Sequence, residues 1–190
     1  MTTLTLHDET TAPEAAGAAL AGVRKAYGMI PNVLAEMAEN PAVLDAYLAL
    51  AGFTAKTGFN ALELQVVQIA TSVENECHFC VAAHTAVAKG QRLDDAVIAA
   101  VRDRRPIAET RLEALRQFTT KVVALRGFVS DADVAAFKAA GWSDADILAV
   151  ILNVAMKSIT NYVNHIAETP LNAPFQAFAW TPARKQPIPA

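Results

Sequence analysis

Residues 74–84 of this chain read Glu-Asn-Glu-Cys-His-Phe-Cys-Val-Ala-Ala-His and hold both of its cysteines and two of its four histidines. On an α-helix, residues three, four and seven positions apart share a face. Cys77, Cys80 and His84 are separated by those intervals. The spacing therefore puts two thiols and an imidazole along one stripe of a single helix, which makes the segment a candidate redox or metal site.

The segment before the cysteines decides between two folds that use such a pair. A thioredoxin-like Cys-x-x-Cys follows a strand of a βαβ unit. Here Asn60 and Glu63 form a capping box that predicts the start of a helix. Its inward stripe is Leu62, Val66, Ile69 and Val73. Because no other segment alternates as a strand does, the predicted fold class is all-α, a compact multi-helix bundle.

The rest of the chain carries the same helical pattern, with caps and breakers between the segments. Helices are expected over residues 13–28, 41–57, 60–73, 75–90, 93–101, 109–126, 130–141 and 143–166, with a short one after Pro31. Residues 1–190 are predicted to form a single helical domain. Within it, residues 1–12 form an N-terminal arm. Residues 170–190, which contain five prolines, form an extended C-terminal tail.

Composition and charge exclude several classes of protein. Hydrophobic residues make up 53% of the chain, yet no run of 18 apolar residues predicts a membrane span. The net charge of −3 gives no basic surface for nucleic acid. The start of the chain has no positive segment followed by an apolar one, so no export signal is predicted and the cytoplasm is expected. The high apolar share favours a homo-oligomer.

The reactivity of the cysteines depends on their thiolate fraction, because a free thiol has a pKa of about 8.5. If Asn75 caps the helix expected over residues 75–90, Cys77 lies in the first turn of that helix, where the positive end of the helix dipole favours a thiolate. His84, one turn beyond Cys80, can take its proton or pair with its anion. Glu74 and Glu76 oppose this, since nearby carboxylates disfavour another anion. Two thiols at this spacing can close an easily reduced disulfide.

Two other interpretations compete with the redox site. Buried cysteines in a helix are often inert core residues. The second interpretation is a zinc site with Cys77, Cys80 and His84 as ligands, but a structural zinc site needs a fourth ligand. His7, His78 and His165 form no pair that supplies one. No metal and no cofactor are therefore expected.

The segments Asn60-Ala-Leu-Glu-Leu-Gln-Val-Val and 74–85, with Gly-Met-Ile-Pro-Asn-Val upstream and Asn161-Tyr-Val-Asn-His165 downstream, resemble the carboxymuconolactone decarboxylase superfamily, in its AhpD-like alkylhydroperoxidase branch. The resemblance implies that Cys80 attacks a hydroperoxide substrate, that Cys77 resolves the product to a disulfide, and that His84 handles the proton. It implies a dithiol protein or small thiol as reductant. It also implies trimers or hexamers.

The chain departs from the family pattern at two positions. Gln65 stands where the family carries a relay carboxylate, and Phe79 stands where some members carry a relay histidine. The predicted function is a thiol-dependent peroxidase or disulfide oxidoreductase that reduces hydroperoxides. The alternatives are a non-enzymatic redox-sensing or metal-binding helical oligomer and a carboxymuconolactone-decarboxylase-type enzyme. The last is disfavoured because that branch lacks the cysteine pair. Asn161 and His165, one turn apart, either line the pocket or belong to an interface cluster.

Overall fold

The computed structural model describes residues 4–182, and within that range every regular element is helical. The predicted all-α fold class is thereby confirmed. The α-helices are α1 (Glu14–Tyr27), α2 (Asn32–Met37), α3 (Pro41–Thr54), α4 (Ala61–Glu74), α5 (His78–Gly90), α6 (Asp95–Arg102), α7 (Thr110–Ala124), α8 (Asp131–Ala139) and α9 (Asp144–Ala167). A 3-10 helix, η1 (Ala173–Phe178), follows them.

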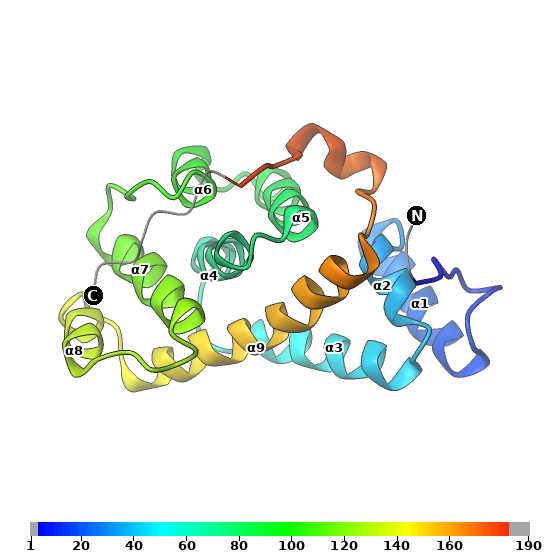
Figure 1. The fold of residues 1–190 in the computed structure, drawn as a ribbon, viewed down its shortest axis with the longest axis horizontal. Coiled ribbons are helices and arrows are strands. Elements are labelled where there is room, and N and C mark those ends of the chain that lie inside the picture. The colour runs from blue at the N-terminus through cyan, green and yellow to red at the C-terminus, as the bar shows by residue number, and fades with distance from the viewer. Residues whose placement is uncertain (1–3, 183–190) are drawn as a thin grey trace.

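Helix α4 lies at the centre of the fold and packs against α5, α6, α7 and α9 (Figure 1). The long helix α9 runs along one side of the molecule, where it also contacts α2 and α3. Two hydrophobic clusters result. One lies among α4, α6, α7 and α8, and the other joins α1, α2 and α3 to the first turn of α5. The candidate cysteines belong to the second cluster.

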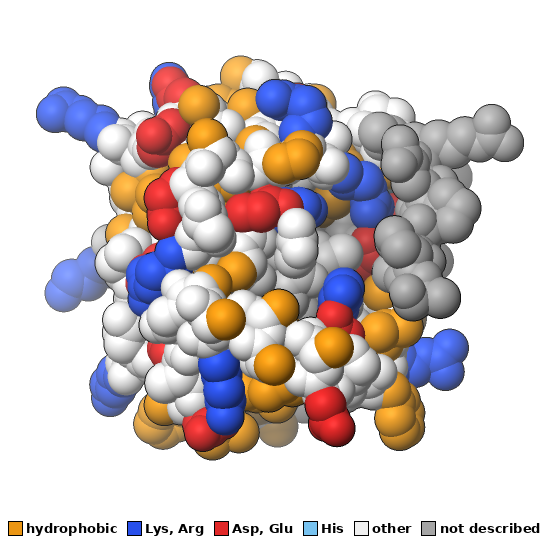
Figure 2. All heavy atoms as spheres, turned by 90° about the vertical axis from the view of Figure 1, so that its left-hand side faces the viewer, with side chains coloured by type: hydrophobic (Ala, Val, Ile, Leu, Met, Phe, Trp, Pro, Cys, Tyr) orange, Lys and Arg blue, Asp and Glu red, His pale blue; other side chains and the backbone are white. Residues whose placement is uncertain are grey.

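Among the described helices, α9 alone is long and apolar enough to cross a membrane by length and composition, a test that a core helix also passes. Its inner face packs on α2, α3, α4, α5 and α7. On its outer face, Leu148, Ile151, Tyr162 and Ile166 are exposed. Hydrophobic side chains also gather along the lower edge of the face drawn in Figure 2. A subunit interface is one use for such a surface, and the homo-oligomer stays a prediction.

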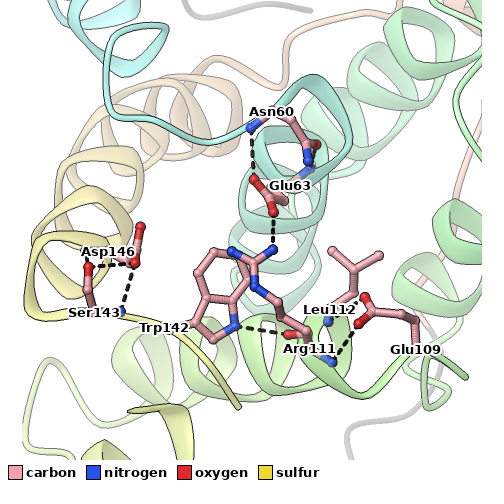
Figure 3. Close-up of polar contacts among 8 residues, drawn as sticks. All are labelled: Asn60, Glu63, Glu109, Arg111, Leu112, Trp142, Ser143 and Asp146. Atoms are coloured by element: carbon pink, nitrogen blue, oxygen red, sulfur yellow. Dashed lines mark hydrogen bonds and ion pairs between the residues drawn. The ribbon is translucent and has the colours of Figure 1, made fainter. Parts of the chain in front are cut away.

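Capping boxes begin three of the helices, and the sequence predicts the first of them. The side chains of Asn60 and Glu63 hydrogen-bond reciprocally with each other's backbone N–H at the start of α4. The Ser130–Asp133 and Ser143–Asp146 pairs do the same for α8 and α9. Figure 3 shows how the first box ties into the bundle: Glu63 also accepts from Arg111 of α7, whose guanidinium lies over the Trp142 ring. These local signals fix where α4, α8 and α9 begin.

The cysteine helix begins later than expected. Asn75 ends α4 as its C-cap instead of starting α5, and Glu76 takes a left-handed backbone with φ of 58°. Cys77 is the N-cap of α5, so the helix proper starts at His78. The expectation that Cys77 lies in the first turn is therefore wrong. Cys80, the third residue of α5, lies in the first turn instead, at the positive end of the helix dipole, which favours a thiolate.

Both ends of the described range are held to the bundle. In the arm, His7 contacts Glu39, and Glu9 pairs with Arg24 of α1. The tail is not extended throughout, because Ala173–Phe178 form η1, which packs on α5. The residues expected in the arm at 1–3 and in the tail at 183–190 lie outside the described part of the chain.

Candidate active site

The two thiols lie inside the protein at the start of α5. Cys77 is 0% exposed and Cys80 2%, and both are free. One side chain from α9 contacts both sulfurs: Asn164 donates from Nδ2 to Cys80 Sγ at 3.2 Å and to Cys77 Sγ at 3.5 Å. The two sulfurs are therefore neighbours around a single amide group.

Helix α9 turns a polar stripe towards these thiols. Lys157, Thr160 and Asn164 are buried on one face, three and seven residues apart. The Cys80 thiol donates to Thr160 Oγ1 at 3.5 Å, and the Thr160 hydroxyl donates to the carbonyl oxygen of Lys157 at 3.1 Å. If Cys80 ionises, the Thr160 hydroxyl can turn and donate to the sulfur instead. The stripe therefore offers donors to a thiolate at Cys80.

His84 is held by partners on both of its ring nitrogens. Nε2 lies 2.8 Å from Lys157 Nζ, and Nδ1 lies 3.0 Å from Gln65 Oε1. An ammonium has no lone pair, so Lys157 donates and Nε2 accepts. The ring proton is then on Nδ1 and is donated to the amide oxygen of Gln65. The expected contact between His84 and Cys80 is replaced by this chain of three side chains.

The surroundings of the thiols separate their acidities. Burial raises the pKa of Cys80, but four favourable contacts outweigh it and leave the pKa well below its ordinary value. These are the Cys77 hydrogen bond, the charge of Lys157, and the hydrogen bonds of Thr160 and Asn161. The same hydrogen bond to Cys80, with burial, raises the pKa of Cys77. Cys80 is thus the more acidic thiol of the pair and Cys77 the less acidic one.

Burial, followed by the charge of Lys157, lowers the pKa of His84 well below its ordinary value. An imidazolium at this position would face the Lys157 ammonium directly. His84 is therefore a neutral imidazole at neutral pH.

A cavity of about 320 Å³ leads to Cys80. Its lining includes the polar side chains of Cys80, His84, Lys157 and Thr160. The remaining wall is apolar or aromatic and comes from Tyr27, Met29, Pro31, Val33, Leu34, Tyr47, Phe79, Ala83, Ala86, Val87, Pro174 and Phe175. Cys77 does not line it. A substrate in this cavity therefore meets Cys80 and not Cys77.

The sequence-predicted candidates fall into two groups. Cys80 and His84 line the cavity, and Cys77 and Gln65 stand directly behind them. Phe79 packs edge-on against Phe175 of η1 in the cavity wall.

The other candidates lie outside the cavity. His78 is exposed, with Nδ1 2.8 Å from the carbonyl oxygen of Trp180. Asn161 is buried and bonds Asn75, while His165 is exposed, so neither lines the pocket. The carboxylate of Glu74 is paired with Arg104.

Sequence reasoning missed Lys157, Thr160 and Asn164. The signal was present, because these polar residues recur at helical intervals within the otherwise apolar stretch 147–166. For metal ions, no group of three or more His, Cys, Asp or Glu side chains in residues 4–182 is arranged to hold one.

Comparisons with known proteins place this geometry in context. Residues 41–121 match the model of the carboxymuconolactone decarboxylase family. A comparison with curated proteins finds no match. Among solved structures, the chain is similar to an alkylhydroperoxidase AhpD core, an uncharacterised peroxidase-related protein from Ralstonia eutropha JMP134. The TM-score is 0.81 at 22% identity, with 92% of this chain and 94% of that chain covered.

Two further solved structures share the fold. A peroxidase-related protein from Silicibacter sp. TM1040 has a TM-score of 0.77 at 22% identity over 91% of this chain and 92% of that one. A cysteine-to-alanine variant of the debrominase Bmp8, in complex with 2,3,4-tribromopyrrole, has a TM-score of 0.78 at 14% identity over 93% and 95%. At these identities the likeness establishes the fold alone.

Proposed function

Since this chain belongs, through residues 41–121, to the carboxymuconolactone decarboxylase family and has the AhpD-like fold, we propose that it is a thiol-dependent peroxidase that reduces organic hydroperoxides. One observation carries the proposal. A buried thiol with a strongly lowered pKa, Cys80, lies at the end of an apolar cavity, and a second thiol stands next to it.

The reaction has three steps. The Cys80 thiolate attacks the terminal oxygen of the hydroperoxide and becomes a sulfenic acid, while the O–O bond breaks and the alkoxide leaves as an alcohol after taking a proton. Cys77 then attacks the sulfenic sulfur, which forms the disulfide and releases water. A dithiol reductant, protein or small molecule, returns both cysteines to thiols.

Each cysteine is suited to its step. Cys80 faces the cavity with a lowered pKa, which favours the thiolate that attacks the substrate. Cys77 is shielded from the cavity and keeps its proton, which protects it from direct oxidation by the substrate. Asn164 contacts both sulfurs and so holds them close for disulfide formation. His84 belongs to the same site, where its two partners fix its orientation.

Steady-state turnover tests this function. The purified protein is mixed with cumene hydroperoxide and dithiothreitol, and the loss of hydroperoxide is measured beside Cys80→Ser and Cys77→Ser variants. We expect many turnovers per chain for the wild type and none for Cys80→Ser. Oxidation that stops at one disulfide per chain with every dithiol supplied would instead indicate a redox sensor.

A second candidate function is reductive dehalogenation of a small aromatic compound. A debrominase shares the fold, and the apolar cavity of about 320 Å³ has room for a five-membered ring. The two thiols would supply the two electrons: the carbon–halogen bond is replaced by a carbon–hydrogen bond, halide leaves, and the disulfide forms. Release of bromide from 2,3,4-tribromopyrrole in the presence of dithiothreitol distinguishes this activity from peroxide reduction.

A further inference from the structure

Lys157 is a buried cation to which the three-step thiol mechanism above gives no role. Its side chain is 1% exposed, in the middle of the mostly apolar helix α9, and it lines the same cavity as Cys80. The ion pairs formed by the described residues include none with Lys157. A buried ammonium without an opposite charge is costly, so an anion is needed nearby.

The cavity offers few groups that can supply that anion. Besides Cys80 and Lys157, the ionisable groups among the described lining residues are His84, Tyr27 and Tyr47. A histidine carries no negative charge, and burial raises the pKa of Tyr47. Tyr27 is 56% exposed at the rim. Among the described residues that line the cavity, the Cys80 thiolate is therefore the anion that suits Lys157.

His84 and Gln65 orient the Lys157 ammonium. Because Nε2 of His84 accepts from Lys157, this nitrogen is not free to take the proton of Cys80. Gln65 keeps the His84 proton on Nδ1, since its amide oxygen accepts a hydrogen bond from Nδ1–H without adding a charge. Nε2 of His84 therefore stays the acceptor for Lys157. A carboxylate at position 65 would favour the imidazolium, which would repel Lys157. The glutamine that departs from the family pattern is therefore matched to the lysine.

We propose that Lys157 is a catalytic residue of this site, as the counter-cation of the Cys80 thiolate and the acid that protonates the leaving alkoxide. The proposal rests on the peroxidase function proposed above. When the O–O bond breaks, the alkoxide takes a proton from the Lys157 ammonium and leaves as the alcohol. Once the dithiol has reduced the disulfide, the Cys80 thiol gives its proton to the Lys157 amine, which restores the ion pair. The net reaction converts hydroperoxide and dithiol into alcohol, water and disulfide.

The test uses Lys157→Met, which keeps most of the side-chain length without the charge. The rate at which iodoacetamide alkylates Cys80 is measured from pH 4 to pH 10, with the site identified by mass spectrometry. Loss of a neighbouring cation is expected to raise the midpoint of this profile by about 1–3 pH units. The second-order rate with cumene hydroperoxide at pH 7 is expected to fall at least about tenfold, because general acids contribute roughly 10²- to 10⁴-fold.

Two further variants separate the roles. Lys157→Arg keeps the positive charge but cannot release a proton, so the alkylation midpoint should stay low while the peroxide rate falls. Lys89→Met is the matched control: it removes a lysine from α5 whose side chain is 58% exposed, and neither measurement should change. Circular dichroism checks that each variant is folded, and Lys157→Gln replaces Lys157→Met if the latter is not.

Two results have distinct meanings. A folded, charge-neutral variant with an unchanged alkylation midpoint and an unchanged peroxide rate overturns the role of Lys157. If the wild type does not turn over hydroperoxide but the midpoint still moves in Lys157→Met, the ion pair stands, and the proposed function, with the proton donation that depends on it, is overturned.

Discussion

Replacing Asn164 with leucine tests the hydrogen bonds that stabilise the Cys80 thiolate. Leucine has nearly the same shape but no donor, so both N–H···S contacts disappear, the shorter at 3.2 Å to Cys80. A hydrogen bond to a charged group contributes about 1.5–3 kcal/mol. One pKa unit corresponds to about 1.4 kcal/mol. The pKa of Cys80 should therefore rise by about 1–2 units.

The same substitution should cost little stability. Asn164 Oδ1 is buried and has no hydrogen-bond partner among the described residues, so the leucine also removes an unsatisfied acceptor. The assay is the absorbance of the thiolate near 240 nm as a function of pH, together with the midpoint of urea unfolding. Absorbance reports ionisation directly and does not depend on substrate or reductant.

Asn153→Leu is the matched control for this prediction. Asn153 lies on the same helix, fully buried, and binds Gln68 and the carbonyl of Ala149 but neither sulfur. Its loss leaves the Gln68 amide unpaired and should destabilise the fold by about 1–3 kcal/mol without moving the thiolate titration. A folded Asn164→Leu protein whose titration matches that of the wild type would refute the assignment of Asn164 as a thiolate donor.

Two further predictions concern stability. Phe137 is 1% exposed and stacks between Phe118 and Trp142, so Phe137→Ala should lower the free energy of unfolding by about 3–5 kcal/mol, measured by urea denaturation. A loss below about 1 kcal/mol would mean that the aromatic stack is not part of the stable core. Burial raises the pKa of Glu36, although its carboxylate accepts a hydrogen bond from Thr169. The protonated carboxyl therefore stabilises the folded protein below the pKa of the unfolded state, and this stabilisation is lost as pH rises through the pKa of the folded state. Glu36→Gln should therefore be more stable than the wild type at pH 8 and nearly equal to it at pH 4, and a difference that does not vary with pH would contradict this.

The fold was largely predictable because its signals are local. Capping boxes form through hydrogen bonds within four residues, and they mark the helix starts at Asn60, Ser130 and Ser143. The start of α5 was misplaced because Asn75 suits a helix N-cap and a helix end equally well. What decides between them is the left-handed turn at Glu76, a non-glycine residue that no local pattern marks.

The site was only half predictable for a different reason. Cys77, Cys80 and His84 are close in sequence, so helical spacing brings them together. Lys157 and Asn164 come from α9, more than seventy residues away, and only tertiary packing sets them against the thiols. The expected proton transfer between Cys80 and His84 assumed a free imidazole. In the structure a lysine and a glutamine occupy its two nitrogens.

The proposed mechanism requires that Cys80 attacks the hydroperoxide and that Cys77 resolves the product. To test this division of roles, the Cys77→Ser and Cys80→Ser proteins are each treated with one equivalent of cumene hydroperoxide, trapped with dimedone, and analysed by mass spectrometry. A trapped sulfenic acid is expected on Cys80 in the Cys77→Ser protein, and none on Cys77 in the Cys80→Ser protein over the same time. Trapping of Cys77 as fast as Cys80, or of neither cysteine in the folded proteins, would contradict it.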